Sequence, residues 1–171
     1  MKGLDHNHFR TGREIRATAD RPFHFVDSGL PNLYLVGIKY FQSGCGRVVV
    51  EIPAMKQLLG LIARVIVAQP EALTGAEIRF LRKRLAHKAV DFAKSISVEP
   101  ETLSRIENGR QTAGDGTDKL IRLYYLLACE DPFITKARRT VIGQLGSQKQ
   151  QAATPRKLVA RVKKNQWETA C

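Results

Sequence analysis

The sequence predicts a mainly α-helical fold with one small β-hairpin, on three observations. Apolar residues recur every three or four positions through most of residues 54–128, which is the spacing of helices with one buried face. Two short runs of β-branched and aromatic residues, at 33–41 and 47–52, flank a glycine-containing loop as hairpin strands do. The chain has 171 residues, 43% of them hydrophobic, which suits one domain with extensions or two small domains.

The first third of the chain is predicted to hold an arm and a small module. Residues 1–22 mix Arg, His, Asp and Gly without apolar periodicity, which is typical of a flexible arm. Residues 23–69 contain the hairpin and, after Pro53, a helix that ends near Gln69. Since an isolated hairpin is barely stable in water, we expect this helix to support it.

The helix predicted at 54–68 has an apolar stripe wider than one face, because Leu61 and Val67 lie outside the main row. Such a helix either packs between the hairpin and the next domain or meets a second copy of the chain. Packing within the chain is the commoner arrangement, and a homodimer is the alternative.

Residues 74–129 are predicted to form a compact all-helical domain. Thr74 and Glu77 make a capping box, in which each side chain satisfies a free backbone donor at the start of a helix. Apolar residues then repeat at helical spacing through four or five short segments, up to about Ala128. The boundary with the preceding module is placed at residues 69–73.

The segment 97–110 is predicted to form a tight turn, a short helix and a glycine stop. Pro100 suits the first helical position, where its missing N–H costs nothing. Leu103 and Ile106 lie three residues apart and give one buried edge, and Gly109 can take the left-handed conformation that ends a helix. A helix this short needs neighbours to be stable. The pattern is that of the recognition half of a helix-turn-helix.

Three strings in this unit resemble the Cro and lambda-repressor family of helix-turn-helix proteins: Leu81-Arg82-Lys83-Arg84, Phe92-Ala93 and Thr102-Leu103-Ser104-Arg105-Ile106-Glu107-Asn108-Gly109. The resemblance covers residues 74–129. It implies a lambda-repressor-like fold for this unit and a DNA-binding transcriptional regulator of the XRE type, with repression as its action. The family usually places Gly in the turn before the recognition helix, where this chain has Ser97.

The upstream region, a hairpin and helix leading into Leu73-Thr74-Gly75-Ala76-Glu77-Ile78-Arg79-Phe80-Leu81-Arg82-Lys83, is similar to a subgroup of bacterial antitoxin-like regulators with a zinc-ribbon-derived module. Only Cys45 lies near the metal loop that this resemblance implies, so no metal site and no cofactor are predicted. As the alternative function, the resemblance implies an antitoxin that binds a toxin protein and represses its own operon.

The candidate DNA-binding residues are Glu101, Thr102, Ser104, Arg105, Asn108 and Arg110. In this docking mode the N-terminal residues of the recognition helix reach base edges in the major groove. Arg105 can pair with O6 and N7 of guanine, and Thr102 can contact a thymine methyl group. Glu101 either accepts from a cytosine amino group or serves only the helix dipole. The resemblance places Asn108 and Arg110 at positions that contact the DNA backbone, where Ser104 can add a hydroxyl group.

Composition favours an anionic partner and gives little support for catalysis. The formal net charge is +12, and residues 130–171 hold nine Lys or Arg against three acidic residues. This basic tail is predicted to be partly disordered, with a basic helix at 155–167 as the alternative, and to strengthen DNA binding by counterion release. The sequence has no glycine-rich phosphate loop, no His-Glu-x-x-His and no Gly-x-Ser-x-Gly, so no enzyme is predicted.

Location and assembly follow from the same features. The three cysteines form no Cys-x-x-Cys pair, and His6, His8 and His24 are interpreted as solvated. No apolar run has the length of a signal peptide or a membrane span, which predicts a cytoplasmic, nucleoid-associated protein with no membrane contact. Since one small DNA-binding unit gives limited sequence specificity, we predict a homodimer on a palindromic operator in double-stranded DNA.

Overall fold

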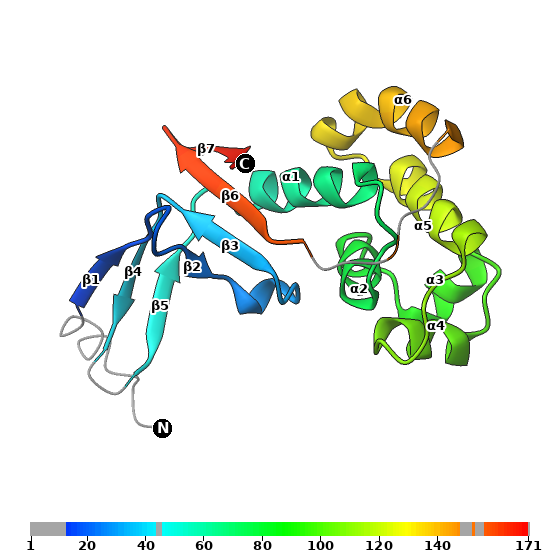
Figure 1. The fold of residues 1–171 in the computed structure, drawn as a ribbon, viewed down its shortest axis with the longest axis horizontal. Coiled ribbons are helices and arrows are strands. Elements are labelled where there is room, and N and C mark those ends of the chain that lie inside the picture. Colours follow the sequence, from blue (N-terminus) through cyan, green and yellow to red (C-terminus); the bar gives the residue numbers. More distant parts are fainter. Residues whose placement is uncertain (1–12, 44–45, 148–151, 153–155, 171) are drawn as a thin grey trace, which may run out of the picture.

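The structure, a computed structural model, describes the whole chain except residues 1–12, 44–45, 148–151, 153–155 and 171. It corrects the predicted fold class. Helices hold 47% of the chain and strands 20%, in two sheets of three and four strands, so the fold is mixed α/β rather than mainly α with a small hairpin. Figure 1 shows the sheets on one side of α1 (Met55–Ala68) and the other helices on its far side.

The first sheet contains the predicted hairpin and one additional strand. β4 (Lys39–Gln42) and β5 (Val48–Glu51) pair antiparallel, with Phe41 opposite Val49. β1 (Arg13–Arg16) pairs antiparallel with β4 on the other side, so the order is β1-β4-β5. β1 lies within the predicted flexible arm, whose first 12 residues are outside the described part of the chain.

The second sheet joins the two ends of the chain. Its order is β2-β3-β6-β7, built from β2 (Phe23–His24), β3 (Leu33–Val36), β6 (Leu158–Lys163) and β7 (Gln166–Thr169). β3 and β6 run parallel, with Leu33 opposite Leu158. The apolar run at 33–41, predicted as one strand, is divided at Gly37 into β3 in this sheet and β4 in the other. This pairing of distant segments left no local signal in the sequence.

The C-terminal region differs from the predicted basic tail. It contains α6 (Pro132–Ser147) and then the antiparallel hairpin β6–β7, where a basic helix at 155–167 was the predicted alternative. Lys164 and Asn165 form the turn, both with positive φ (46° and 64°), and asparagine tolerates this conformation. Trp167 on β7 is buried, and its Nε1 donates a hydrogen bond of 2.7 Å to the carbonyl oxygen of Pro53.

The remaining helices form a group next to α1 (Figure 1). They are α2 (Gly75–Arg84), α3 (Ala89–Ser95), α4 (Pro100–Glu107) and α5 (Asp115–Ala128), followed by α6, and a short 3-10 helix covers Val26–Ser28. The predicted capping box is confirmed, because the Thr74 hydroxyl accepts from the Glu77 amide and the Glu77 carboxylate accepts from the Thr74 amide. This box fixes the first turn of α2 after the 69–73 connection.

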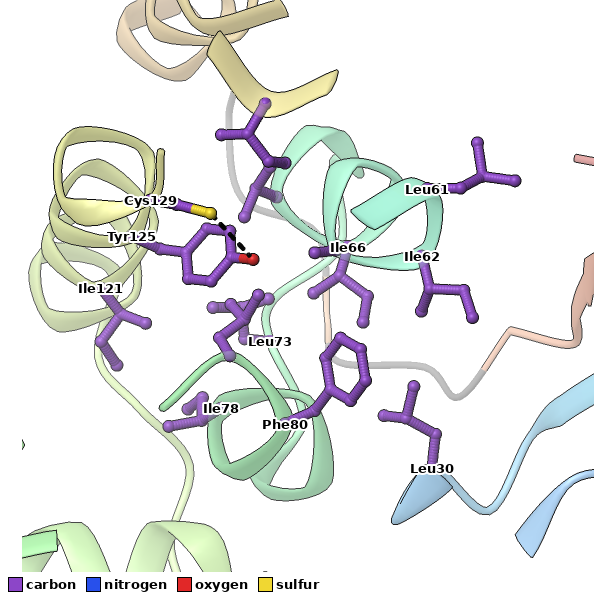
Figure 2. Close-up of a cluster of buried hydrophobic side chains, with 14 of the residues drawn as sticks. Leu30, Leu61, Ile62, Ile66, Leu73, Ile78, Phe80, Ile121, Tyr125 and Cys129 are labelled. Atoms are coloured by element: carbon purple, nitrogen blue, oxygen red, sulfur yellow. Dashed lines mark hydrogen bonds between the residues drawn. The ribbon is translucent and has the colours of Figure 1, made fainter. Parts of the chain in front are cut away.

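One hydrophobic core runs through both parts of the molecule. Figure 2 shows Phe80 of α2 below Ile62 and Ile66 of α1, with Leu30 on the sheet side of Phe80 and Tyr125 of α5 on the other side of Ile66. The wide apolar stripe of α1 is therefore covered within the chain, by sheet strands on one side and helices on the other. Burial raises the pKa of the Tyr125 hydroxyl, which keeps this group neutral in the core.

A buried ion pair fixes the connection between α1 and α2. Arg122 and Asp118 of α5 are each 2% exposed, and Arg122 Nε donates to Asp118 Oδ1 over 2.6 Å. The other guanidinium nitrogens of Arg122 donate to four carbonyl oxygens between residues 66 and 71. Asp118 also accepts from the backbone amide of Leu73 at 2.6 Å. The end of α1 is thereby held against α5.

Candidate nucleic-acid interface

α3 and α4 are joined by a tight turn. The amide of Val98 donates to the carbonyl of Ala93 at 2.9 Å, and Ser97 in the turn has a φ of 53°. Ser97 thus holds the left-handed conformation that glycine adopts without strain. α4 starts at Pro100, and Gly109 just after its end has a φ of 69°, so the predicted start and stop of this helix are confirmed.

α4 has one buried and one exposed face. Leu103 and Ile106 are buried at 0% and 3% exposure and attach the helix to the core. The exposed face holds side chains three or four positions apart: Glu101, Ser104, Arg105 and Asn108. Thr102 is half-buried at the edge of this face, and Arg110 is exposed beyond the end of the helix. All six predicted DNA-binding residues therefore lie on α4 or at its C-terminus.

A buried carboxylate ties α4 to α2. The Glu107 side chain is 6% exposed and accepts two hydrogen bonds from Arg82, at 2.6 and 2.8 Å. Arg79 adds a third hydrogen bond at 3.3 Å. The hydrogen bond to Glu107 raises the pKa of the Arg82 guanidinium further above its usual range, so this guanidinium stays charged. A bidentate Arg–carboxylate contact has a fixed geometry, which sets the orientation of α4.

Asn108 already has partners within the protein. Its Oδ1 accepts from Arg79 at 2.7 Å, and its Nδ2 donates to the carbonyl oxygen of Ser104 at 2.8 Å. The Ser104 hydroxyl oxygen lies 3.4 Å from the same nitrogen. The side chains of Asn108 and Ser104 thus help to close the end of α4. For Glu101, Arg105 and Arg110 the described part of the chain provides no side-chain hydrogen bond or ion pair.

The start of α2 lies directly against the end of α4. A Cβ atom added at Gly75 would clash with the carbonyl oxygen of Ile106 and would lie 2.9 Å from that of Glu107. Only glycine permits this distance, since both neighbouring atoms belong to the backbone. The contact and the ion pair of Glu107 together fix the C-terminal end of α4.

Five cations of the helical unit have no ion-pair partner among the residues described, and all are exposed: Lys83, Lys88, Lys94, Arg105 and Arg110. Lys88 precedes the first residue of α3 and Lys94 lies in its last turn. These two lysines were not among the predicted site residues. Their place at the two ends of α3, the helix before α4, is the signal that would have found them.

Other kinds of site have little support. No group of three His, Cys, Asp or Glu suited to a metal ion occurs in the described ranges, and His6 and His8 fall outside them. His24 Nε2 lies 2.7 Å from the carbonyl oxygen of Pro31, and its ring stacks on Tyr34. Of the helices whose placement is known, none is long and apolar enough to cross a membrane.

A hollow of about 460 Å³ lies between α1 and the β6–β7 hairpin. Its lining includes Leu61 and Val65 of α1, Val159 of β6 and Arg156. Arg156 pairs with Glu71 at 3.0 Å, and the lining contains no paired acid and base. The hollow does not reach the exposed face of α4.

Comparison with known proteins identified no relative: no family model, no curated protein and no solved structure matches the chain.

Proposed function

We propose that this chain is a sequence-specific transcriptional regulator that binds double-stranded DNA through α4 and acts as a repressor. One observation carries the proposal. A short helix is held rigidly by the buried Glu107 pair, and it exposes an arginine that has no partner within the described chain. Fixed orientation and a free planar donor are what direct base recognition in the major groove requires.

Roles follow from position along α4. Arg105 would donate both guanidinium bonds to O6 and N7 of a guanine, and Thr102 would contact a thymine methyl group. Arg110 would bind a phosphate group, with Lys88 and Lys94 at the ends of α3 as further phosphate contacts. Asn108 and Ser104 would contact the DNA backbone while keeping their bonds at the end of α4.

Supporting arguments come from the sequence and the charge. The string from Thr102 to Gly109 resembles the recognition helix of the Cro and lambda-repressor family. The net charge of +12 favours a polyanion as partner. Two copies would bind a palindromic operator, because a single DNA-binding unit of this size discriminates only weakly between DNA sequences. A regulator of this kind would work in the cytoplasm, at the nucleoid.

Selection of bound duplexes from a random library tests the proposal. The wild-type chain should enrich one palindromic motif. In Arg105→Ala, the position read by Arg105 should lose its base preference, which corresponds to about 1–3 kcal/mol of discrimination. Lys56→Ala is the matched control, since it removes one exposed positive charge from the first turn of α1. Failure of the wild-type chain to enrich any motif would refute sequence-specific binding.

A further inference from the structure

β5 is an open edge of the first sheet. Among the described strands it pairs with β4 on one side and with nothing on the other. Two of its three valines are exposed, Val48 to 46% and Val49 to 44%, and Phe41 opposite Val49 is 37% exposed. An apolar strand edge with free backbone groups is a template for another strand. The question is which strand it accepts.

The hydrogen-bonding pattern of the hairpin shows which backbone groups of β5 point outward. The Ser43 amide donates to the Arg47 carbonyl at 2.9 Å, which makes these two residues a hydrogen-bonded pair of the ladder. Such pairs alternate along an antiparallel ladder. Val49 and Glu51 therefore also point their backbone groups toward β4. The backbone N–H and C=O groups of Val48 and Val50 point away from β4, toward the open edge where a further strand would bind.

Side-chain charge then selects the register. Arg47 and Glu51 lie two residues before and two residues after Val49, on the same face of the strand, and both are exposed. Consider two copies of β5 that pair antiparallel about a two-fold axis through Val49. Arg47 of each copy then lies opposite Glu51 of the other copy, which gives two pairs of opposite charge. The outward backbone groups of Val48 then meet those of Val50 in the second copy. The strand is thus complementary to itself in both hydrogen bonding and charge.

We propose that β5 is the dimer interface, and that two copies pair through it antiparallel with Val49 on the two-fold axis. The first sheets of the two copies then form one continuous six-stranded sheet. No other ion-pair partner for Arg47 or Glu51 exists within the described ranges. This interface replaces the α1 stripe as the basis for a dimer, because α1 is covered within the chain.

The strength of the pairing follows from its size. A four-residue strand buries far less than the roughly 800 Å² per partner of a stable interface. The dimer should therefore form and dissociate with protein concentration. This inference does not rest on DNA binding, since it uses only the first sheet.

Charge reversal tests the pairing, with the full chain in the absence of DNA. Sedimentation over a range of concentrations should show a reversible monomer–dimer equilibrium for the wild type. Arg47→Glu and Glu51→Arg should each raise the dimer dissociation constant about tenfold, because two like-charged pairs replace two opposite ones. The double variant should return it to near the wild-type value. Arg105→Ala should dimerise as the wild type does, which separates this test from that of DNA recognition.

A backbone variant gives a second test. The amide of Val48 points away from β4, so Val48→Pro removes an outward donor without removing a bond of the hairpin. It should abolish dimerisation and leave the circular dichroism spectrum unchanged. The inference is overturned if the wild type is monomeric at every concentration, if the single reversals dimerise as well as the wild type, or if the double reversal fails to restore pairing.

Discussion

The helical unit and the two sheets are held together in opposite ways. α2 to α5 follow one another in the chain. The buried ion pair of Glu107 holds α4 to α2, and the buried Arg122 holds α5 to the end of α1. The second sheet contains strands from both ends of the chain, and its strands β6 and β7 pack against α1. The comparison indicates that contacts among consecutive helices position the exposed face of α4, while contacts between the two ends of the chain build the second sheet beside α1.

The largest loss of stability is expected from a change in β7, which packs against α1. Trp167 is 5% exposed and bonds to Pro53, so Trp167→Ala should lower the free energy of unfolding by about 3–5 kcal/mol. Denaturant unfolding would measure this. Glu168→Ala, which removes an exposed ion pair with Lys163, should change stability by less than about 1 kcal/mol. Equal stability of both variants would mean that the packing of the C-terminal hairpin against α1 contributes nothing to stability.

The next largest loss of stability is expected when the ion pair that holds α4 to α2 is broken. Glu107→Gln leaves Arg82 partly buried without its carboxylate, so the free energy of unfolding should fall by about 3 kcal/mol. Glu101→Gln is the control on the same helix, because Glu101 is exposed and should change stability by less than about 0.5 kcal/mol. Chemical denaturation of both variants would show whether the buried pair positions α4. A Glu107→Gln protein as stable as the Glu101→Gln protein would contradict this.

A smaller effect, of opposite sign, is expected in the turn before α4. Ser97 holds a φ of 53°, so Ser97→Gly should stabilise the protein by about 1 kcal/mol. Ser95→Gly is the matched control two residues earlier, where the backbone is helical and glycine should cost about 0.5 kcal/mol. Thermal unfolding should therefore move in opposite directions for the two variants. A loss of stability in both would argue against the left-handed turn.

The smallest effect concerns long-range attraction to DNA. On the proposed binding mode, Lys94→Ala should weaken DNA binding about equally on all sequences and reduce the slope of log affinity against log salt by about 1, since it would remove one proposed phosphate contact. Lys164→Ala removes an exposed charge from the β6–β7 turn and should change the slope by less. Titrations at several salt concentrations would separate the two. An equal change would mean that the sheets also lie against DNA.

The two regions also differ in how well the sequence predicts them. Thr74 with Glu77, Pro100 and Gly109 act within four residues of their own position, so each signal is visible locally. The sequence of β6 mixes basic and apolar residues and does not by itself distinguish a strand from a helix. Its pairing partner β3 lies near the other end of the chain, so no neighbouring segment indicates the pairing. Asn165, a residue type that tolerates the positive φ found in the β6–β7 turn, is a local feature that the sequence analysis did not use.

The candidate site shows the same limit. The exposure of Arg105 follows from helical spacing with Leu103 and Ile106. The bond between Asn108 and Arg79 joins two helices, so no spacing within either helix indicates it. Arg122 and Asp118 lie four residues apart on α5, so their ion pair can be predicted from the sequence. The hydrogen bonds from Arg122 to the carbonyl groups at the end of α1 can be seen only in the structure.

Footprinting at modest ionic strength, on duplexes recovered by selection, tests most directly that α4 recognises DNA through Arg105. The wild-type chain and Lys56→Ala should protect the same short tract. Arg105→Ala should leave that tract open at the same protein concentration while unfolding at the same denaturant concentration as the wild type. Unaltered protection in Arg105→Ala, or no protected tract with the wild-type chain, would contradict the account.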